Sequence, residues 1–436
     1  MTLLDKMLQT LPNLNTVQST GRVLRITGTL IEASGPAAGV GELCRIATSG
    51  GSEPCMAEVI AFHGSNILLM PLKTLSGIAP GALVEVVGNQ AAIPVGEGLR
   101  GRVINALCEP IDGGGAIVGE EMRTVVSSPP SPLQRRPVAA ILETGVRAID
   151  SLTTLGQGQR VGIMAGSGVG KSTLLGMIAR RATADINVIA LIGERGREVA
   201  EFIQRDLGPE GLARSIVVVV TSDEMPLLRV KGALVATTIA EYFRDQGANV
   251  VLMMDSLTRV AMAQREIGLA IGEPPTTRGY TPSTFSLLPQ ILERAGNSAT
   301  GSITGIYTIL VEGDDFNEPV SDTARGILDG HIVLSRQLAA RGHYPSIDVL
   351  HSLSRVMPQV VTAEHLSAAQ SLRDQLATYT ESEDLISIGA YQKGTNPTLD
   401  RVIDRMGAIK AFLCQSIDEH TGLDETLTVL KMLGAQ

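Results

Sequence analysis

The stretch VGIMAGSGVGKSTLLGMIAR, residues 161–180, places three glycines and a lysine between two apolar runs. The run GIMA predicts a strand and KSTLLGMIARRA predicts a helix, so the intervening glycines predict a tight turn. Such a turn leaves backbone N–H groups unpaired, and they point into one concavity together with the positive end of the helix dipole. The stretch therefore predicts a phosphate-binding loop.

The residues after the turn fit this chemistry. Lys171 can reach the β- and γ-phosphates of a nucleotide, and the hydroxyl of Ser172 can ligate Mg²⁺. Ala165 stands where the strict pattern G-x-x-x-x-G-K-[ST] has its first glycine, so the match is incomplete at that position. A glycine-rich turn with a chance lysine is the alternative, but the order of strand, turn, GKS and helix favours the phosphate loop. The residues expected to bind the nucleotide here are Gly166, Ser167, Gly168, Val169, Gly170, Lys171, Ser172 and Thr173.

Two further carboxylates follow apolar strands. Asp255 ends the run NVVLMMD, and the carboxyl edge of a parallel sheet is where ligands bind, so we expect Asp255 to hold the Mg²⁺ shell with Ser172. Glu194 follows the run NVIALIG and is expected to polarise the attacking water. Arg195 beside it is expected to touch the γ-phosphate, and Glu198 lies one turn further on. The alternatives are a helix-capping Asp255 and a solvated charge cluster in GERGREV.

The chain divides into a short N-terminal segment and three zones. Residues 1–18 have apolar side chains at helical spacing and predict an amphipathic helix. Residues 19–93 hold short β-type runs broken by Gly and Pro, which predict a small all-β barrel. Residues 94–356 alternate apolar strands with helical stretches, which is typical of a parallel sheet covered on both faces. Residues 357–436 lose the β signal and predict a C-terminal helical domain.

The strands expected in the central zone are VGIMA (161–165), NVIALIG (187–193), SIVVVVTS (215–222), NVVLMMD (249–255) and GIYTILVEG (305–313). At the front of this zone, SSPPSPLQRRP (127–137) predicts an extended connector stiffened by proline.

Composition excludes several classes of protein. No apolar run approaches the roughly 18–20 residues of a membrane span. The four cysteines are scattered without a CxxC pair, which argues against a metal site or a disulfide framework and fits a reducing cytosol. The net charge of −9 disfavours a nucleic-acid binder.

Several long motifs resemble the rotary-type ATPases, which comprise the headpiece of ATP synthase and its relatives in type III protein export. They are AGSGVGKST, LIGERGREV, MMDSLTRVA, GEPPTTRGYTPS, VEGDDFNEP, DGHIVLSR and HYPSIDVLHSLSRVM. Within this superfamily, four stretches are most similar to the flagellar type III export ATPase. They are RGREVAEFI, TIAEYFRDQG, RVAMAQREIGLAIGEPPTTRGYTPS and EDLISIGAYQKG. The ATPase of a virulence injectisome is the near alternative. The resemblance runs from about residue 20 to the C-terminus, and it implies a RecA-like central domain.

The resemblance also implies a homohexameric ring with ATP bound between neighbouring subunits. Spacing alone does not pick an arginine finger from the 36 Lys and Arg residues. In PSIDVLHSLSR, however, Arg355 matches the finger that reaches the next subunit's nucleotide, and Tyr344 matches the aromatic side chain that packs on adenine. Glu194 matches a carboxylate that non-catalytic synthase subunits lack. An intrasubunit ion pair for Arg355 and a half-buried core tyrosine are the alternatives.

The resemblance also implies binding partners, because the related ATPases act within the export apparatus. The loop Glu273–Tyr280 matches the segment facing the central hole of the ring, so we expect it to contact a coiled-coil stalk protein. The helix at 1–18 is expected to bind a stator-like regulatory protein, unless it packs on its own domain or frays. Export chaperone–cargo complexes and a membrane export gate complete the expected partners. The protein is expected in the cytoplasm, peripheral at the inner face of the membrane.

The sequence can be compared with three functions, each from a different class. The first is Mg²⁺-dependent ATP hydrolysis that energises flagellar protein export. The second is a hexameric RNA translocase, which residues 20–95 disfavour because they hold four basic against five acidic residues and Phe62 as their one aromatic. The third is a non-hydrolysing scaffold, which Glu194, Asp255 and Arg355 together disfavour.

Overall fold

The computed structural model describes residues 19–49, 53–89, 92–311, 315–316 and 318–435. The amphipathic helix predicted for residues 1–18 lies outside the described residues. Two compact units are present: one holds the residues up to Ala92 together with Glu266–Glu273, and the other holds Ile93–Arg265 and Pro274–Gln436. In the part of the chain that the structure describes, no helix is long and apolar enough to cross a membrane.

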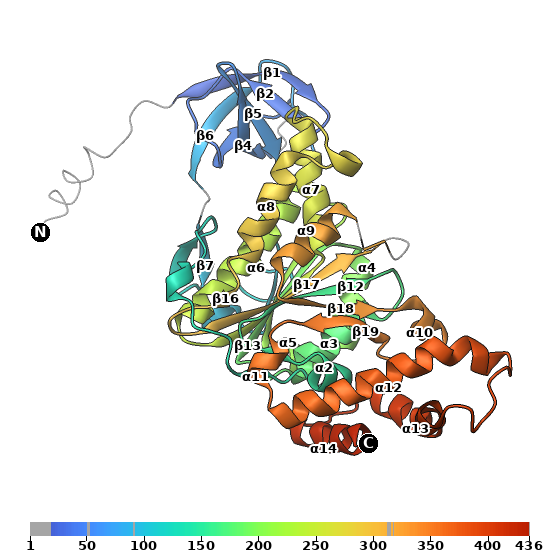
Figure 1. Ribbon diagram of the computed structural model, residues 1–436. Coiled ribbons are helices and arrows are strands. Elements are labelled where there is room, and N and C mark those ends of the chain that lie inside the picture. The colour runs from blue at the N-terminus through green and yellow to red at the C-terminus, as the bar shows by residue number, and fades with distance from the viewer. Residues whose placement is uncertain (1–18, 50–52, 90–91, 312–314, 317, 436) are drawn as a thin grey trace, which may run out of the picture. The chain divides into compact units, whose positions relative to one another are not determined.

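The first unit contains a closed antiparallel barrel, as its short β-type runs predicted (Figure 1). Alternate residues of each strand point inward, and Val23, Ile31, Cys44, Val59 and Leu69 are buried in the barrel core. In barrel order the strands are β1 (Thr20–Thr27), β2 (Leu30–Ala33), β5 (Asn66–Pro71), β4 (Cys55–His63), β3 (Glu42–Ile46) and β6 (Leu83–Asn89).

The second unit is built on one large, mainly parallel sheet. All five predicted strands are present in it, and they occupy its centre. Its strands, in spatial order, are β19 (Ile347–Ser354), β18 (Gly330–Leu334), β12 (Arg160–Ala165), β17 (Ser302–Leu310), β15 (Asn249–Asp255), β13 (Ile186–Glu194), β14 (Ser215–Thr221) and β8 (Val103–Ile104), with β16 (Gly296–Asn297) paired to β17. Two smaller pairings join β7 (Ala92–Val95) to β9 (Glu121–Thr124) and β10 (Ile141–Leu142) to β11 (Leu155–Gly156).

Helices cover both faces of this sheet, which explains why its strands are apolar throughout (Figure 1). Alternate residues such as Val161 and Ile163 join one core with α2 and α3, and α6 packs against β13, β14 and β15. The helices of this region are α2 (Arg147–Leu152), α3 (Lys171–Arg181), α4 (Gly196–Glu201), α5 (Gly208–Ala213), α6 (Pro226–Asp245), α7 (Leu257–Ala270), α8 (Pro282–Leu292), α9 (Pro319–Ile327), α10 (Arg336–Ala340) and α11 (Met357–Val360). A π-helical turn (Phe202–Leu207) links α4 to α5, and short 3₁₀ turns lie at Glu97–Leu99, Pro132–Gln134 and Thr277–Gly279.

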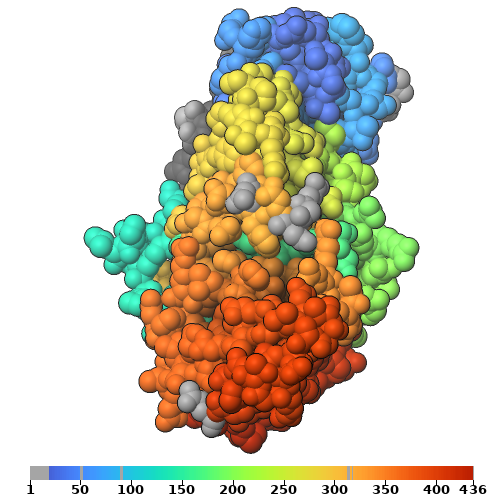
Figure 2. Space-filling view, turned by 45° about the vertical axis from the view of Figure 1, so that its right-hand side comes forward, coloured from blue at the N-terminus to red at the C-terminus, as the bar shows by residue number. Residues whose placement is uncertain are grey.

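The C-terminal region is helical, as predicted, and consists of α12 (Ala363–Ser387), α13 (Pro397–Leu413) and α14 (Leu423–Gly434). Most of its buried apolar side chains belong to the same apolar core as α2 and α3. Arg147 of α2 reinforces this union, because its Nε donates to the carbonyl of Phe412 at 2.9 Å. These helices therefore belong to the second compact unit, and Figure 2 shows their red surface continuing into the orange segment before them.

The connector at 127–137 is fixed near its C-terminal end by its two arginines. Arg135 donates to the carbonyl of Ala295 at 2.8 Å, and Arg136 donates to the carbonyls of Ser298 at 3.0 Å and Thr300 at 2.8 Å. The segment thus lies within the second unit and is anchored to it.

Candidate active site

The phosphate loop joins β12 to α3 at the carboxyl edge of the sheet. Gly168 and Gly170 have φ values of 76° and 91°, in the left-handed region that favours glycine. The carbonyl of Gly170 accepts from the N–H of Leu174 at 3.0 Å, so the first turn of α3 begins directly at the loop. The backbone of this loop has the form that the sequence predicted for binding phosphate.

A cavity of about 380 Å³ opens over the loop. Its volume lies in the range typical of small-molecule sites. Most of the lining side chains are polar or charged, as a triphosphate requires. Besides loop residues Gly166, Ser167, Gly168, Gly170, Lys171, Ser172 and Thr173, the cavity is lined by Glu194, Arg195, Glu198, Glu201, Arg205, Asp206, Arg259 and Leu310.

Lys171 lies between the two predicted carboxylates. Its Nζ is 2.6 Å from Oδ1 of Asp255 and 3.3 Å from Oε1 of Glu194. Asp255 ends β15 and Glu194 ends β13, and these neighbouring parallel strands bring their last residues to one edge of the sheet. Burial alone would lower the pKa of Lys171, but the charges of Asp255 and Glu194 outweigh it and raise that pKa. The lysine is therefore a fixed cation at the end of the phosphate loop.

Glu194 is poised to take up a proton. Burial raises the pKa of its carboxyl, and although Lys171 opposes this shift, a hydrogen bond with Glu198 adds to it. The same hydrogen bond lowers the pKa of Glu198. Nη2 of Arg259 lies 3.8 Å from Oε2 of Glu194. A carboxylate with a raised pKa at the rim of a phosphate site can accept a proton from water.

Two side chains of this cluster were not found from the sequence. Thr308 donates its hydroxyl to Oδ1 of Asp255 at 2.7 Å, and Arg259 of α7 approaches Glu194. The sequence could have pointed to Thr308, because it is a polar residue within an apolar strand that lies beside the strand ending in Asp255. Arg259 carried no such signal, because spacing does not distinguish it from the other basic residues.

Ser172 and Asp255 lie where the sequence expected a metal site. Both line a hollow of about 20 Å³ that also contacts Glu194. Hydroxyl and carboxylate oxygens are the donors that Mg²⁺ prefers, and Mg²⁺ at such sites uses one or two protein ligands with phosphates and waters. In the described ranges no group of three or more His, Cys, Asp or Glu residues could hold a metal by itself. The donors present therefore fit a metal shared with a nucleotide.

Arg195 and Tyr344 were also predicted to contact the nucleotide, and they lie at different places around the loop. The side chain of Arg195 is 78% exposed at the mouth of the cavity and lies 3.5 Å from Glu198. The ring of Tyr344 is half exposed and lies beside the loop, 3.7 Å from where a Cβ on Gly170 would stand. Ser346 donates to the carbonyl of Val169 at 2.6 Å, which holds the segment carrying Tyr344 against the loop.

Arg355 is not brought to this cavity. It follows β19, and its backbone N–H donates to the carbonyl of Asp329 at 2.9 Å, next to the first residue of β12. The phosphate loop leaves the opposite end of β12. Arg355 is exposed, and no carboxylate among the described residues forms an ion pair with it. The prediction that it acts on another subunit's nucleotide is not tested by a single chain.

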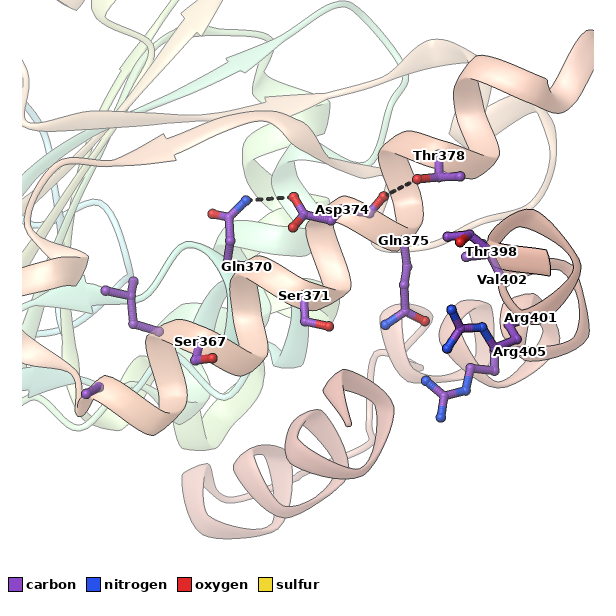
Figure 3. A pocket seen from close by; sticks show the side chains of 12 residues that line it. Ser367, Gln370, Ser371, Asp374, Gln375, Thr378, Thr398, Arg401, Val402 and Arg405 are labelled. Carbon is purple, nitrogen blue, oxygen red and sulfur yellow. Dashed lines mark hydrogen bonds between the residues drawn. The ribbon is translucent and has the colours of Figure 1, made fainter. Parts of the chain in front are cut away.

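A larger cavity, of about 780 Å³, lies between α12 and α13 (Figure 3). Arg401 and Arg405 of α13 face Gln375 of α12 across it, and Gln370 donates to Asp374 on its wall. It holds no glycine loop and no strand-end carboxylate, so the nucleotide chemistry belongs to the smaller cavity.

The chain matches known families along most of its length. The nucleotide-binding domain of the ATP synthase alpha/beta family matches residues 145–354, and the beta-barrel domain of that family matches residues 23–88. The T3SS EscN ATPase C-terminal domain matches residues 361–432. The flagellum-specific ATP synthase of Bacillus subtilis is 55% identical over 95% of this chain and 94% of its own length. The chain belongs to the type III export branch of the ATP synthase alpha/beta family.

This export ATPase has relatives in both secretion systems. The type 3 secretion system ATPase of Xanthomonas euvesicatoria is 50% identical over 94% of this chain and 93% of its own length. The assembled ATPase EscN of enteropathogenic Escherichia coli, solved in complex with its central stalk EscO, superposes with a TM-score of 0.88 at 47% identity. That comparison covers 95% of this chain and 100% of EscN. The predicted three-part fold, the ATPase activity and the kinship with flagellar export ATPases are confirmed.

Proposed function

We propose that this ATPase hydrolyses ATP in a homohexameric ring and so energises the type III export of flagellar proteins. The proposal is carried by the position of Lys171, which meets Asp255 and Glu194 at the end of the phosphate loop. In this arrangement Asp255 would hold the metal, Glu194 orients the water and Lys171 binds the phosphate. A scaffold that bound ATP without cleaving it would have no use for Glu194 at this place.

Each side chain has a role in the proposed reaction. Glu194 orients the attacking water and accepts its proton, which its raised pKa favours. Lys171 and Arg195 neutralise charge on the γ-phosphate, and Ser172 with Asp255 would hold Mg²⁺, which supplies further neutralisation of the phosphates when bound. Tyr344 stacks on the adenine.

Arg355 completes the site from the neighbouring subunit. Phosphoryl transfer spreads negative charge over the equatorial oxygens, and a finger in trans is worth about 10³–10⁵ in rate. Its exposure, and the absence of an ion pair with any carboxylate among the described residues, support this role. The assembled state of the EscN relative supports a ring, and the EscO stalk of that complex supports a stalk partner at Glu273–Tyr280.

The other proposed partners follow from the export function. They are a stator-like regulatory protein at residues 1–18, chaperone–cargo complexes and a membrane export gate. The proposed location is the cytoplasm, at the inner face of the membrane. We propose no nucleic-acid partner, since the barrel residues carry more acidic than basic groups.

Glu194→Gln tests the chemistry. The amide keeps the shape but cannot accept a proton, so we expect ATP binding to persist while turnover falls by about 10²–10⁴-fold. Phosphate release and binding of a fluorescent ATP analogue measure the two effects, with Glu210→Gln on exposed α5 as the matched control. Normal turnover of Glu194→Gln would remove Glu194 from its role.

A second experiment tests the flagellar assignment against the injectisome alternative, which the 50% identical Xanthomonas relative keeps open. The gene is expressed in cells that lack their own flagellar export ATPase, and in cells that lack the injectisome ATPase. We expect secreted flagellin to return in the first strain. Rescue of the second strain alone would contradict the flagellar assignment.

A further inference from the structure

Asp329 joins the base of Arg355 to the strand that carries the phosphate loop. Its N–H donates to the carbonyl of Arg160 at 2.8 Å, and its carboxylate accepts from the N–H of Arg160 at 3.0 Å. Its carbonyl accepts from the N–H of Arg355 at 2.9 Å. One residue thus bonds both to the first residue of β12 and to the proposed finger.

A second connection runs parallel to the first. The side chain of Gln159 is fully buried, and its Nε2 donates to Oγ of Ser354 at 3.1 Å. The hydroxyl of Ser354 in turn donates to the carbonyl of Thr154 at 2.8 Å. The residues immediately before β12 and immediately before Arg355 are therefore tied to each other.

Strands β18 and β19 approach unusually closely just before Arg355. A Cβ on Gly330 would stand 2.3 Å from the carbonyl oxygen of Leu353 and 3.1 Å from Cα of Ser354. Both obstacles are backbone atoms, which cannot swing aside as a flexible side chain can. A glycine after Asp329 is thus required for the contact that places Arg355.

We propose that Asp329 is a positioning residue that couples the finger of each subunit to that subunit's own phosphate loop. This inference rests on the proposed action of Arg355 in trans. The six residues of β12, Arg160–Ala165, run from the Asp329 anchor to the loop, and their neighbours β17 and β18 hold them in register. Movement of the loop on binding nucleotide is transmitted along this buried strand to the residue that serves the neighbouring nucleotide.

The test uses Asp329→Ala in the full chain. We expect ATP binding to the phosphate loop to persist while kcat falls by about 10- to 100-fold, since a finger misplaced by about an ångström loses most of its effect. Asp329→Asn should keep much of the activity, because its amide oxygen still accepts from the N–H of Arg160. Asp322→Ala, an exposed aspartate of α9, is the matched control and should behave as the unaltered protein.

Mixed rings separate positioning from mere instability. Asp329→Ala subunits have a working phosphate loop and a misplaced finger, whereas Lys171→Ala subunits have the opposite defects. Mixing the two should raise activity above that of either alone, because Lys171→Ala subunits lend Arg355 to their neighbours. A subunit that was only unstable would gain nothing from the mixture.

The outcome also distinguishes this inference from the proposed function. Rescue of Arg355→Ala by Lys171→Ala, without rescue of Asp329→Ala, would overturn the coupling alone. Failure of both mixtures would overturn action in trans itself. If Asp329→Ala does not fold, Gly330→Ala tests the same coupling, because its Cβ would push Ser354 of β19 away from β18 and displace Arg355. It should give the same pattern of low kcat and rescue, and full activity of Gly330→Ala would overturn the coupling.

Discussion

The ammonium of Lys171 lies 2.6 Å from a carboxylate oxygen of Asp255, and both side chains are almost fully buried. Thr308 donates to the same carboxylate oxygen at 2.7 Å. The cluster therefore holds its charges in a preformed arrangement, with the lysine balancing two carboxylates. A site of this kind stabilises developing charge without reorganising its own dipoles.

Removal of Lys171 should make stability depend more strongly on pH. The pKa of Glu194 is already raised by burial, and it rises further without the lysine. A carboxyl with a raised pKa contributes its stability below its unfolded pKa and loses it as pH rises through the folded pKa. We therefore expect Lys171→Met to lose more unfolding free energy at pH 8 than at pH 5, measured by urea denaturation. An equal loss at both pH values would contradict this, and Lys431→Met, from an exposed ion pair, is the control.

Glu198→Gln should shift the pH profile of hydrolysis. Protonated Glu194 donates a hydrogen bond to Glu198, which helps to raise the pKa of Glu194. An amide at position 198 can instead donate to the Glu194 carboxylate and lower that pKa. Glu194 must be deprotonated to act as a base, so the acidic limb of kcat/KM should move to lower pH. Steady-state rates across the acidic range measure this. A limb that stays in place, or moves upward, would show that Glu194 does not govern it.

Tyr344 should affect binding more than chemistry. Its half-exposed ring lies beside Gly170, where it is free to stack on a base. Base stacking is worth about 1–3 kcal/mol, so Tyr344→Ala should raise the KM for ATP by about tenfold and leave kcat unchanged. Tyr344→Phe keeps the ring and should retain the original KM. If the two variants have the same KM, the ring does not stack on adenine.

Arg294 is the largest of the fully buried side chains among the described residues, and it lies away from the site. It is 2% exposed, and its Nε and Nη2 donate to the two carboxylate oxygens of Glu241 at 2.9 and 2.6 Å. Arg294→Met leaves that carboxylate buried without its partner and should cost about 3–5 kcal/mol in unfolding free energy. The double variant Arg294→Met/Glu241→Met should recover part of the loss. Lys393→Met breaks an exposed pair and should leave the midpoint of unfolding unchanged.

The sequence predicted those parts of the fold that local pattern determines. Long apolar runs flanked by turns identified β12, β13, β14, β15 and β17. A carboxylate directly after two of these runs identified Asp255 and Glu194, because parallel strands deliver their carboxyl ends to one edge. The glycines before Lys171 identified the loop. Each of these inferences used residues that are adjacent in the chain.

Features that depend on distant segments were not predictable in this way. The strand β8, Val103–Ile104, is too short to show any period, yet it extends the sheet beside β14. The contacts of Thr308 with Asp255 and of Arg259 with Glu194 join different elements, so no local spacing reveals them. The roles of Tyr344 and Arg355 were expected only from family resemblance, and they remain predictions.

The strand order also constrains synthesis of the chain. Both partners of β12, namely β17 (Ser302–Leu310) and β18 (Gly330–Leu334), are made after it, and residues 166–301 separate it from the first of them. On the ribosome the strand that leads into the phosphate loop therefore has no ladder to join until most of the polypeptide has emerged. Unpaired apolar strands are vulnerable to aggregation during that interval. Nascent chains stalled before Ser302 should consequently be unable to retain ATP, and should depend on chaperones that shield exposed strand edges.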